Sequence, residues 1–183
     1  MIKNYFEVSA LPEGRSSSDF LWKPENLDLK YNNVDFPTDV LLHLNNIRRG
    51  LEITCFGTVS TIIETKCVRC LDVFPIELAE KIDFAVRLIA GAPINSQLWD
   101  EDIVRVDPAS GKIDISPRVR DAVLLGVPTH PLCKPDCKGL CPICGANLNH
   151  GDCGHTKEKQ EKQIDPRWEK LKQLLENKNQ QGG

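Results

Sequence analysis

Residues 51–63, LEITCFGTVSTII, carry the clearest structural pattern in this 183-residue chain. Every second position from Leu51 to Ile63 holds an apolar or small residue, and most of the side chains between them are polar. A two-residue period places alternate side chains on opposite faces of a β-strand, with one face buried. The stretch therefore predicts a half-buried strand rather than a helix.

The same period returns on both sides of this stretch. Apolar residues alternate along Val40–Leu44 and along Ile82–Leu88, and Arg49-Gly50 supplies a turn between the first two runs. Two shorter runs, Ile103–Val106 and Ile113–Ile115, are separated by a Pro- and Gly-containing segment and predict a further hairpin. These patterns predict a mainly β (α+β) fold with an antiparallel, barrel-like or sandwich-like sheet.

Two helix starts follow the strands. Ser116-Pro117 predicts an N-cap and first helical residue for a helix over Arg118–Leu125. Its expected apolar side is Val119, Ala122, Val123 and Leu125. Asp165-Pro166 repeats this signal, and a stripe of apolar residues at helical spacing follows it. We therefore expect one or two short helices beside the sheet.

These elements divide the chain into three parts. We expect a β-rich core over 1–128 and a zinc-binding segment over 129–155. The remainder, 156–183, is predicted to form a charged linker, a terminal amphipathic helix and a disordered tail.

Composition narrows the class of protein. Hydrophobic residues make up 40% of the chain and charged residues 27%, which is typical of a globular protein. The net charge of -3 argues against a basic surface over the whole molecule. No apolar stretch is long enough for a membrane span, and no signal peptide is visible, so we expect a cytoplasmic protein without a membrane partner.

Cysteine is the most informative residue type. The eight cysteines are clustered rather than spread, which favours metal binding over disulfides in a chain without an export signal. The spacing of one run is typical of a structural zinc site, for which we expect four thiolate ligands. The predicted ligands are Cys133, Cys137, Cys141 and Cys144.

Other ligand sets fit the same residues. Cys153 and His155 can replace Cys133 and Cys137 as the second pair of ligands. Eight potential ligands can also form two sites, and Cys67 and Cys70 would then be joined by Cys153 and His155. Cys55, which stands alone, is expected to be a buried strand residue.

No catalytic motif accompanies these ligands. The H-x-E of zinc deaminases, H-E-x-x-H and the glycine-rich nucleotide motifs do not occur. A zinc ion with four protein ligands also has no open position for water. The sequence therefore predicts a structural metal, no enzymatic activity and no small-molecule substrate.

Three motifs together resemble the YceD-like family of large ribosomal RNA subunit accumulation proteins. The string over Leu132–Asn149, LCKPDCKGLCPICGANLN, resembles the C-terminal signature of that family. The motif Cys67-Val68-Arg69-Cys70 resembles its internal C-x-R-C, and Asp165-Pro166-Arg167-Trp168 resembles its usual ending. The likeness extends from about Val40 to the end, with one departure at His155, where the family more often has cysteine.

The resemblance implies a non-enzymatic factor in 23S rRNA accumulation and ribosome assembly. Its partners would be large-subunit rRNA or a ribosomal precursor particle, with a ribosomal protein as an alternative. Four basic residues lie in turns that we expect at one end of the sheet, where they can contact phosphate. These predicted RNA-binding residues are Arg48, Arg49, Lys66 and Arg69.

A second class of function stays open. Thiolates that bind zinc become available for oxidation when the metal leaves, so the chain can also be a zinc-thiol redox-responsive protein. Lys134 and Lys138 would lower thiolate pKa values under either hypothesis.

Overall fold

The computed structural model describes residues 5–92 and 103–155. The chain divides into two compact units, Met1–Cys137 and Lys138–Gly183. The predicted linker, terminal helix and tail over 156–183 lie outside the described residues, and the three-part division remains a prediction. Among the described residues, no helix has the length and apolarity needed to cross a bilayer.

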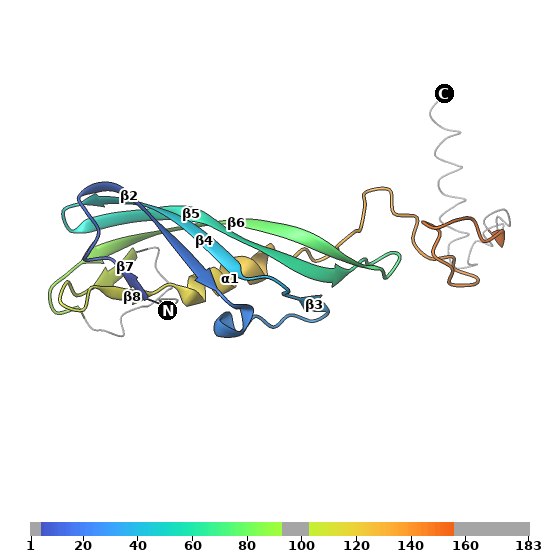
Figure 1. The fold of residues 1–183 in the computed structure, drawn as a ribbon, viewed down its shortest axis with the longest axis horizontal. Helices are drawn as coiled ribbons and strands as arrows, with labels where there is room; N and C mark the ends of the chain where they lie inside the picture. Colours follow the sequence, from blue (N-terminus) through green and yellow to red (C-terminus); the bar gives the residue numbers. More distant parts are fainter. Residues whose placement is uncertain (1–4, 93–102, 156–183) are drawn as a thin grey trace, which may run out of the picture. The chain divides into compact units, whose positions relative to one another are not determined.

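A long, curved sheet forms the first unit (Figure 1). Its strand order is β2-β4-β5-β6-β7, and a two-residue strand, β3, also pairs with β5. The strands are β2 (Gly14–Trp22), β3 (Val34–Asp35), β4 (Val40–Arg49), β5 (Glu52–Lys66), β6 (Val73–Leu88) and β7 (Ile103–Val106). The prediction of a mainly β fold is confirmed, although the sheet is open rather than closed into a barrel.

The long strands follow the alternation in the sequence. Ile53, Cys55, Val59 and Ile63 of β5 are buried, and the residues between them are mostly exposed. The apolar side chains of β4 and β6 fall on the same face because both strands pair with β5 in antiparallel register. This shared apolar face requires a covering layer.

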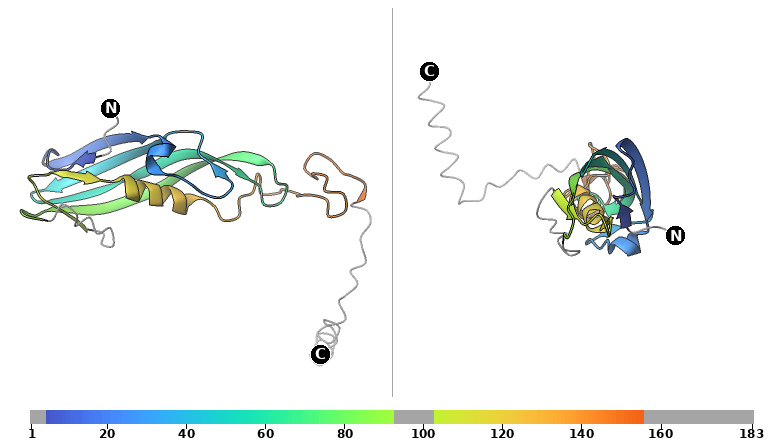
Figure 2. Two further views of the ribbon diagram at one scale, coloured as in Figure 1. Left: turned by 90° about the horizontal axis from the view of Figure 1, so that it is seen from below. Right: turned by 90° about the vertical axis from the view of Figure 1, so that its left-hand side faces the viewer.

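One helix covers that face. Helix α1 (Ser116–Gly126) packs against β5 and β6 and buries Val119 and Val123. Seen along its length, the sheet curves around this helix (Figure 2). The helix begins at Ser116 itself, so Ile115 stands at the predicted serine's N-cap position and supplies no side-chain cap. The Asp114 carboxylate accepts the Ser116 N–H at 2.9 Å. A short 3-10 helix, η1 (Pro24–Leu27), also contacts α1.

Two predictions for the short strands and the helix are wrong. β7 does not form a hairpin with the run that follows it; β7 pairs in parallel with β6, and β8 (Lys112–Asp114) pairs with β1 (Tyr5–Glu7). The turn before β8 explains this change of partner, because the Gly111 carbonyl accepts the Val8 N–H at 2.8 Å. Leu125, predicted on the apolar side of the helix, is 85% exposed.

Candidate metal centres

The described cysteines form two groups with metal-ligand geometry. In each group, the ligand atoms all lie within 4.8 Å of one another. The first group is Cys67, Cys70, Cys133 and Cys137; the second is Cys141, Cys144, Cys153 and His155. Each group lies within one of the two compact units.

The first group is built on the hairpin tip between β5 and β6. The tip closes through two backbone hydrogen bonds, from the Leu71 N–H to the Cys67 carbonyl at 3.0 Å and from the Cys67 N–H to the Asp72 carbonyl at 2.9 Å. Leu71 has a φ of 63°, the left-handed conformation that such a tight turn needs. These bonds point both thiols of the C-x2-C motif toward one position.

The segment after α1 supplies the other two thiols. The Cys67 and Cys137 sulfurs are 3.7 Å apart, and the Cys70 and Cys133 sulfurs are 3.5 Å apart. Four sulfurs bound at about 2.3 Å around a tetrahedral zinc ion would be about 3.8 Å apart. The observed separations therefore fit a four-thiolate metal centre and are far longer than the roughly 2.05 Å of a disulfide.

Hydrogen bonds favour a charged sulfur in this group. Burial raises the pKa of Cys67, but backbone amides of Cys133, Cys70 and Arg69 outweigh it and lower the pKa to about 6. Burial raises the pKa of Cys70 above the usual thiol range. The hairpin thus offers one ready thiolate in Cys67, and Cys70 must lose its proton as a metal binds.

The second group lies within a short segment rich in turns. The Gly145 N–H donates to the Cys141 carbonyl at 2.9 Å, and Gly145 has a φ of 73°. The Cys141 N–H in turn donates to the Ala146 carbonyl at 2.8 Å. Backbone amides of Cys144 and Ile143 lower the pKa of Cys141 to about 6.

His155 completes this second group. Its Nδ1 atom is buried and has no hydrogen-bond partner within the described part of the chain. A buried ring nitrogen without a partner is costly, and coordination to a metal would satisfy it. The residues therefore fit a centre with three thiolates and one imidazole, a common structural zinc set.

The grouping differs from the predicted ligand set. Cys133 and Cys137 join Cys67 and Cys70, whereas Cys141 and Cys144 join the predicted alternates, Cys153 and His155. The spacing of the cysteines between Cys133 and Cys144 predicted one site. Spacing along the chain cannot show that the β5–β6 hairpin tip, far upstream, packs beside Cys133 and Cys137. The signal available in the sequence was the presence of eight potential ligands, enough for two complete sites.

Cys55 is separate from both groups. It is fully buried in β5, as expected, and burial raises its pKa to about 12. Such a thiol is protonated and poorly reactive at neutral pH.

The four predicted RNA-binding residues do not lie together at one end of the sheet. Arg48 and Arg49 precede the turn into β5, whereas Lys66 ends that strand and Arg69 follows it. The fifteen residues of β5 span about 45 Å at about 3.3 Å per residue, so the two pairs lie at opposite ends.

Two of the four residues, both arginines, donate hydrogen bonds to backbone carbonyls. Arg48 Nη1 donates to the Leu11 carbonyl at 2.7 Å and to the Ser9 carbonyl at 3.0 Å. Arg69 Nη1 donates to the Cys137 carbonyl at 3.0 Å, beside the first cysteine group. Within the described residues, the side chains of exposed Arg49 and Lys66 have neither such a hydrogen bond nor an ion pair, so they are the freer of the four cations.

Comparison with known proteins identifies the family. The family model described as "Large ribosomal RNA subunit accumulation protein YceD" matches residues 56–175, more than half of the chain. An uncharacterized protein of Mycobacterium tuberculosis is 35% identical over 140 residues, covering 75% of this chain and 61% of the relative.

Plant relatives carry the family's name. A chloroplastic large ribosomal RNA subunit accumulation protein homologue of Arabidopsis thaliana is 29% identical over 157 residues, covering 72% of this chain and 49% of the relative. One from Zea mays is 32% identical over 136 residues, covering 61% and 46%. The chain thus spans about half to three-fifths of these relatives, and no solved structure matches it. From the match over residues 56–175, the chain belongs to the YceD family of large ribosomal RNA subunit accumulation proteins.

Proposed function

We propose that this protein is a non-enzymatic factor in 23S rRNA accumulation that binds large-subunit rRNA or its precursor particle during ribosome assembly in the cytoplasm. The observation that carries the proposal is the family match, which includes both C-x2-C motifs. A ribosomal protein is an alternative partner on the same particle.

We propose zinc as the metal in both cysteine groups. Thiolate-rich sets of four ligands favour zinc over harder cations. Four protein ligands also leave no open position at the metal, which supports a structural role rather than a catalytic one.

Arg49 and Lys66 would make the phosphate contacts, since the guanidinium groups of Arg48 and Arg69 already donate hydrogen bonds to backbone carbonyls. Each phosphate contact contributes about one unit to the salt dependence of binding. The double variant Arg49→Gln/Lys66→Gln should therefore bind 23S rRNA more weakly, with a salt slope lower by about one to two units. Filter binding over a range of salt concentrations measures both quantities.

A matched control separates phosphate contact from loss of net charge. The double variant Lys30→Gln/Lys112→Gln also removes two positive charges, but from residues that form ion pairs with Asp28 and Glu7. It should leave the salt slope close to wild type. The assembly-factor proposal fails if the wild-type protein does not cosediment with large-subunit precursors and cells without it keep normal 23S levels.

The second candidate function is zinc-linked redox response, and one observation favours it at the second group. Cys144 is exposed and Cys153 is partly exposed, so an oxidant can reach these ligands. Mild peroxide should then release one zinc per chain, measured with a chromophoric chelator. Full retention of zinc under peroxide would rule out this candidate.

A further inference from the structure

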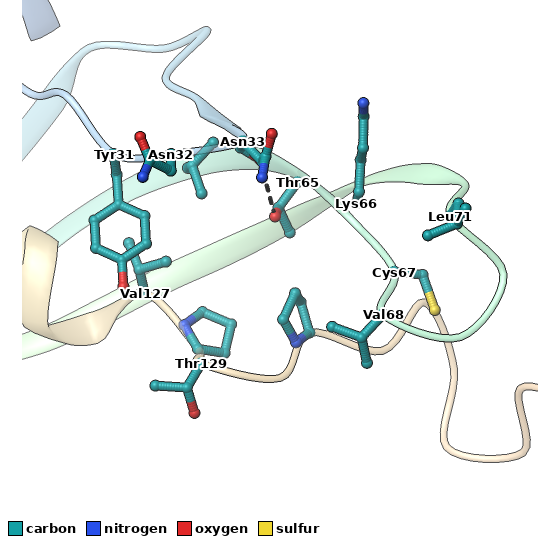
Figure 3. A pocket seen from close by; sticks show the side chains of 13 residues that line it. Tyr31, Asn32, Asn33, Thr65, Lys66, Cys67, Val68, Leu71, Val127 and Thr129 are labelled. Carbon is teal, nitrogen blue, oxygen red and sulfur yellow. Dashed lines mark hydrogen bonds between the residues drawn. The ribbon is translucent and has the colours of Figure 1, made fainter.

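A pocket of about 480 Å³ lies beside the first cysteine group (Figure 3). Three segments of the first unit line it: the turn before β3, the end of β5 with the hairpin tip, and the chain after α1. None of its lining residues is acidic, and Lys66 is its one basic residue. The pocket wall therefore carries no negative charge that would repel an anionic ligand.

Hydrogen bonds hold the three walls in place. The Val34 N–H donates to the Tyr31 carbonyl at 3.3 Å, and the Thr65 hydroxyl donates to the Asn33 carbonyl at 3.3 Å. The Val68 N–H donates to the Pro131 carbonyl at 3.0 Å, which joins the hairpin tip to the chain after α1. The pocket is therefore formed before a ligand arrives, which lowers the entropic cost of binding.

The chemistry of the lining fits a nucleobase. Tyr31 is 45% exposed, and its ring reaches across toward the segment that carries Val127 (Figure 3). Val68, which is 50% exposed, adds apolar surface, and exposed Asn32 offers an amide donor and acceptor. An unstacked base is recognised by these means: an aromatic ring, apolar contact and hydrogen bonds to its edge.

Lys66 completes the set at the rim. Its side chain extends away from Cys67 (Figure 3), and no ion pair holds its ammonium within the described residues. An ammonium group in this position can follow a phosphate that stays in solvent while the base enters the pocket. An apolar peptide side chain would use the apolar walls but would gain nothing from the cation.

We infer that this pocket binds one unstacked base of single-stranded rRNA, stacked on Tyr31, with its edge facing the Asn32 amide and its phosphate near Lys66. The inference rests on the proposed rRNA-binding function and names the form of RNA that this part of the surface recognises. It also links the pocket to the metal, because Cys67 belongs both to the pocket wall and to the first cysteine group.

The test uses the full-length, zinc-loaded protein and a short single-stranded RNA that contains one 2-aminopurine, whose fluorescence reports stacking. Replacing Tyr31 with alanine should weaken binding at least about fivefold, since one stacked base contributes about 1–3 kcal/mol. Tyr31→Phe keeps the ring and should bind within about twofold of wild type. Tyr5→Ala, which removes a 57% exposed tyrosine from β1, is the matched control and should have no effect.

Three outcomes overturn the inference. These are equal binding by Tyr31→Ala and wild type, an equal loss in Tyr5→Ala, or competition for the pocket by an apolar peptide but not by RNA. Cosedimentation of the wild-type protein with large-subunit precursors is measured in parallel. If the wild type cosediments while the Tyr31→Ala variant binds the short RNA normally, the pocket inference fails and the proposed function stands.

Discussion

The two cysteine groups begin with the same turn and differ in what surrounds it. In both, the residue after the second cysteine donates its N–H to the carbonyl of the first, at 3.0 Å for Leu71 and 2.9 Å for Gly145. Both of these residues have a positive φ, 63° and 73°. Both groups therefore contain the same type of turn, and the differences between them come from the surrounding structure.

The first turn is embedded in the sheet. It caps two long strands, and its partner thiols come from 63 and 70 residues further along the chain. Three of its four thiols are buried and pack with Phe74 and Leu132. A metal bound here would close a long loop and tie the segment after α1 to the hairpin tip.

The second turn would depend far more on a bound metal. All four ligands come from residues 141–155, and Cys141 is the one buried apolar side chain in the described part of that unit. A segment with so little apolar burial cannot offset the entropy lost on folding unless metal binding contributes. With the proposed metals bound, the same turn would serve as a clamp in one place and as a folding nucleus in the other.

Cysteine variants give the largest effect and test the grouping directly. We expect two metal ions per chain, one for each group. Replacing Cys67, Cys70, Cys133 and Cys137 with serine should leave one ion, because the second group keeps all its ligands. Replacing Cys133, Cys137, Cys141 and Cys144 should leave none, since each group then loses two ligands. Elemental analysis of the purified variants measures this count.

The same pair of variants can break the comparison. If one structural zinc were bound by Cys133, Cys137, Cys141 and Cys144, wild type would hold one ion. The first variant would then hold none, having lost Cys133 and Cys137. That result would restore the ligand set suggested by spacing alone.

Metal removal should affect the two surroundings unequally. A strong chelator should abolish the hydrogen-exchange protection of amides in 138–155, because the described part of that unit has little apolar burial. The amides of β4, β5 and β6 should remain protected, since their core of buried apolar residues does not involve the cysteine groups. Exchange measured by mass spectrometry before and after chelation separates the two responses. Loss of protection in β5 as fast as in 138–155 would contradict this prediction.

The sequence predicted the parts of this molecule that depend on local patterns. Alternation located β4, β5 and β6, and Ser116-Pro117 located the start of α1 to within one residue. It did not reveal β2, whose three consecutive serines carry no apolar alternation, although pairing with β4 makes them a strand. The strands that the sequence did not place correctly are those whose pairing joins distant segments, such as β1 with β8 and β6 with β7.

The metal ligands divide in the same way. Each C-x2-C turn was visible because its residues are neighbours in sequence. The partner of each turn was not visible, because Cys67 and Cys137 meet only once the hairpin and the chain after α1 have packed. The opposite placement of Arg49 and Lys66 could have been predicted, since two turns that flank one strand must lie at its two ends.

The smallest expected effect tests whether the two turns are truly equivalent. An L-residue in the left-handed conformation costs about 1 kcal/mol relative to glycine, because its Cβ approaches the following carbonyl. Leu71→Gly should therefore strengthen metal binding at the first group by up to about fivefold, and Gly145→Ala should weaken it at the second by a similar factor. A Cβ at Gly145 would meet nothing within 4 Å, so its penalty would come from the backbone alone. Gly151→Ala is the control, since Gly151 is equally open and lacks a positive φ. Competition with a chelator of known affinity measures both groups, and a change of the same sign in Leu71→Gly and Gly145→Ala would show that the turns do not share one conformational requirement.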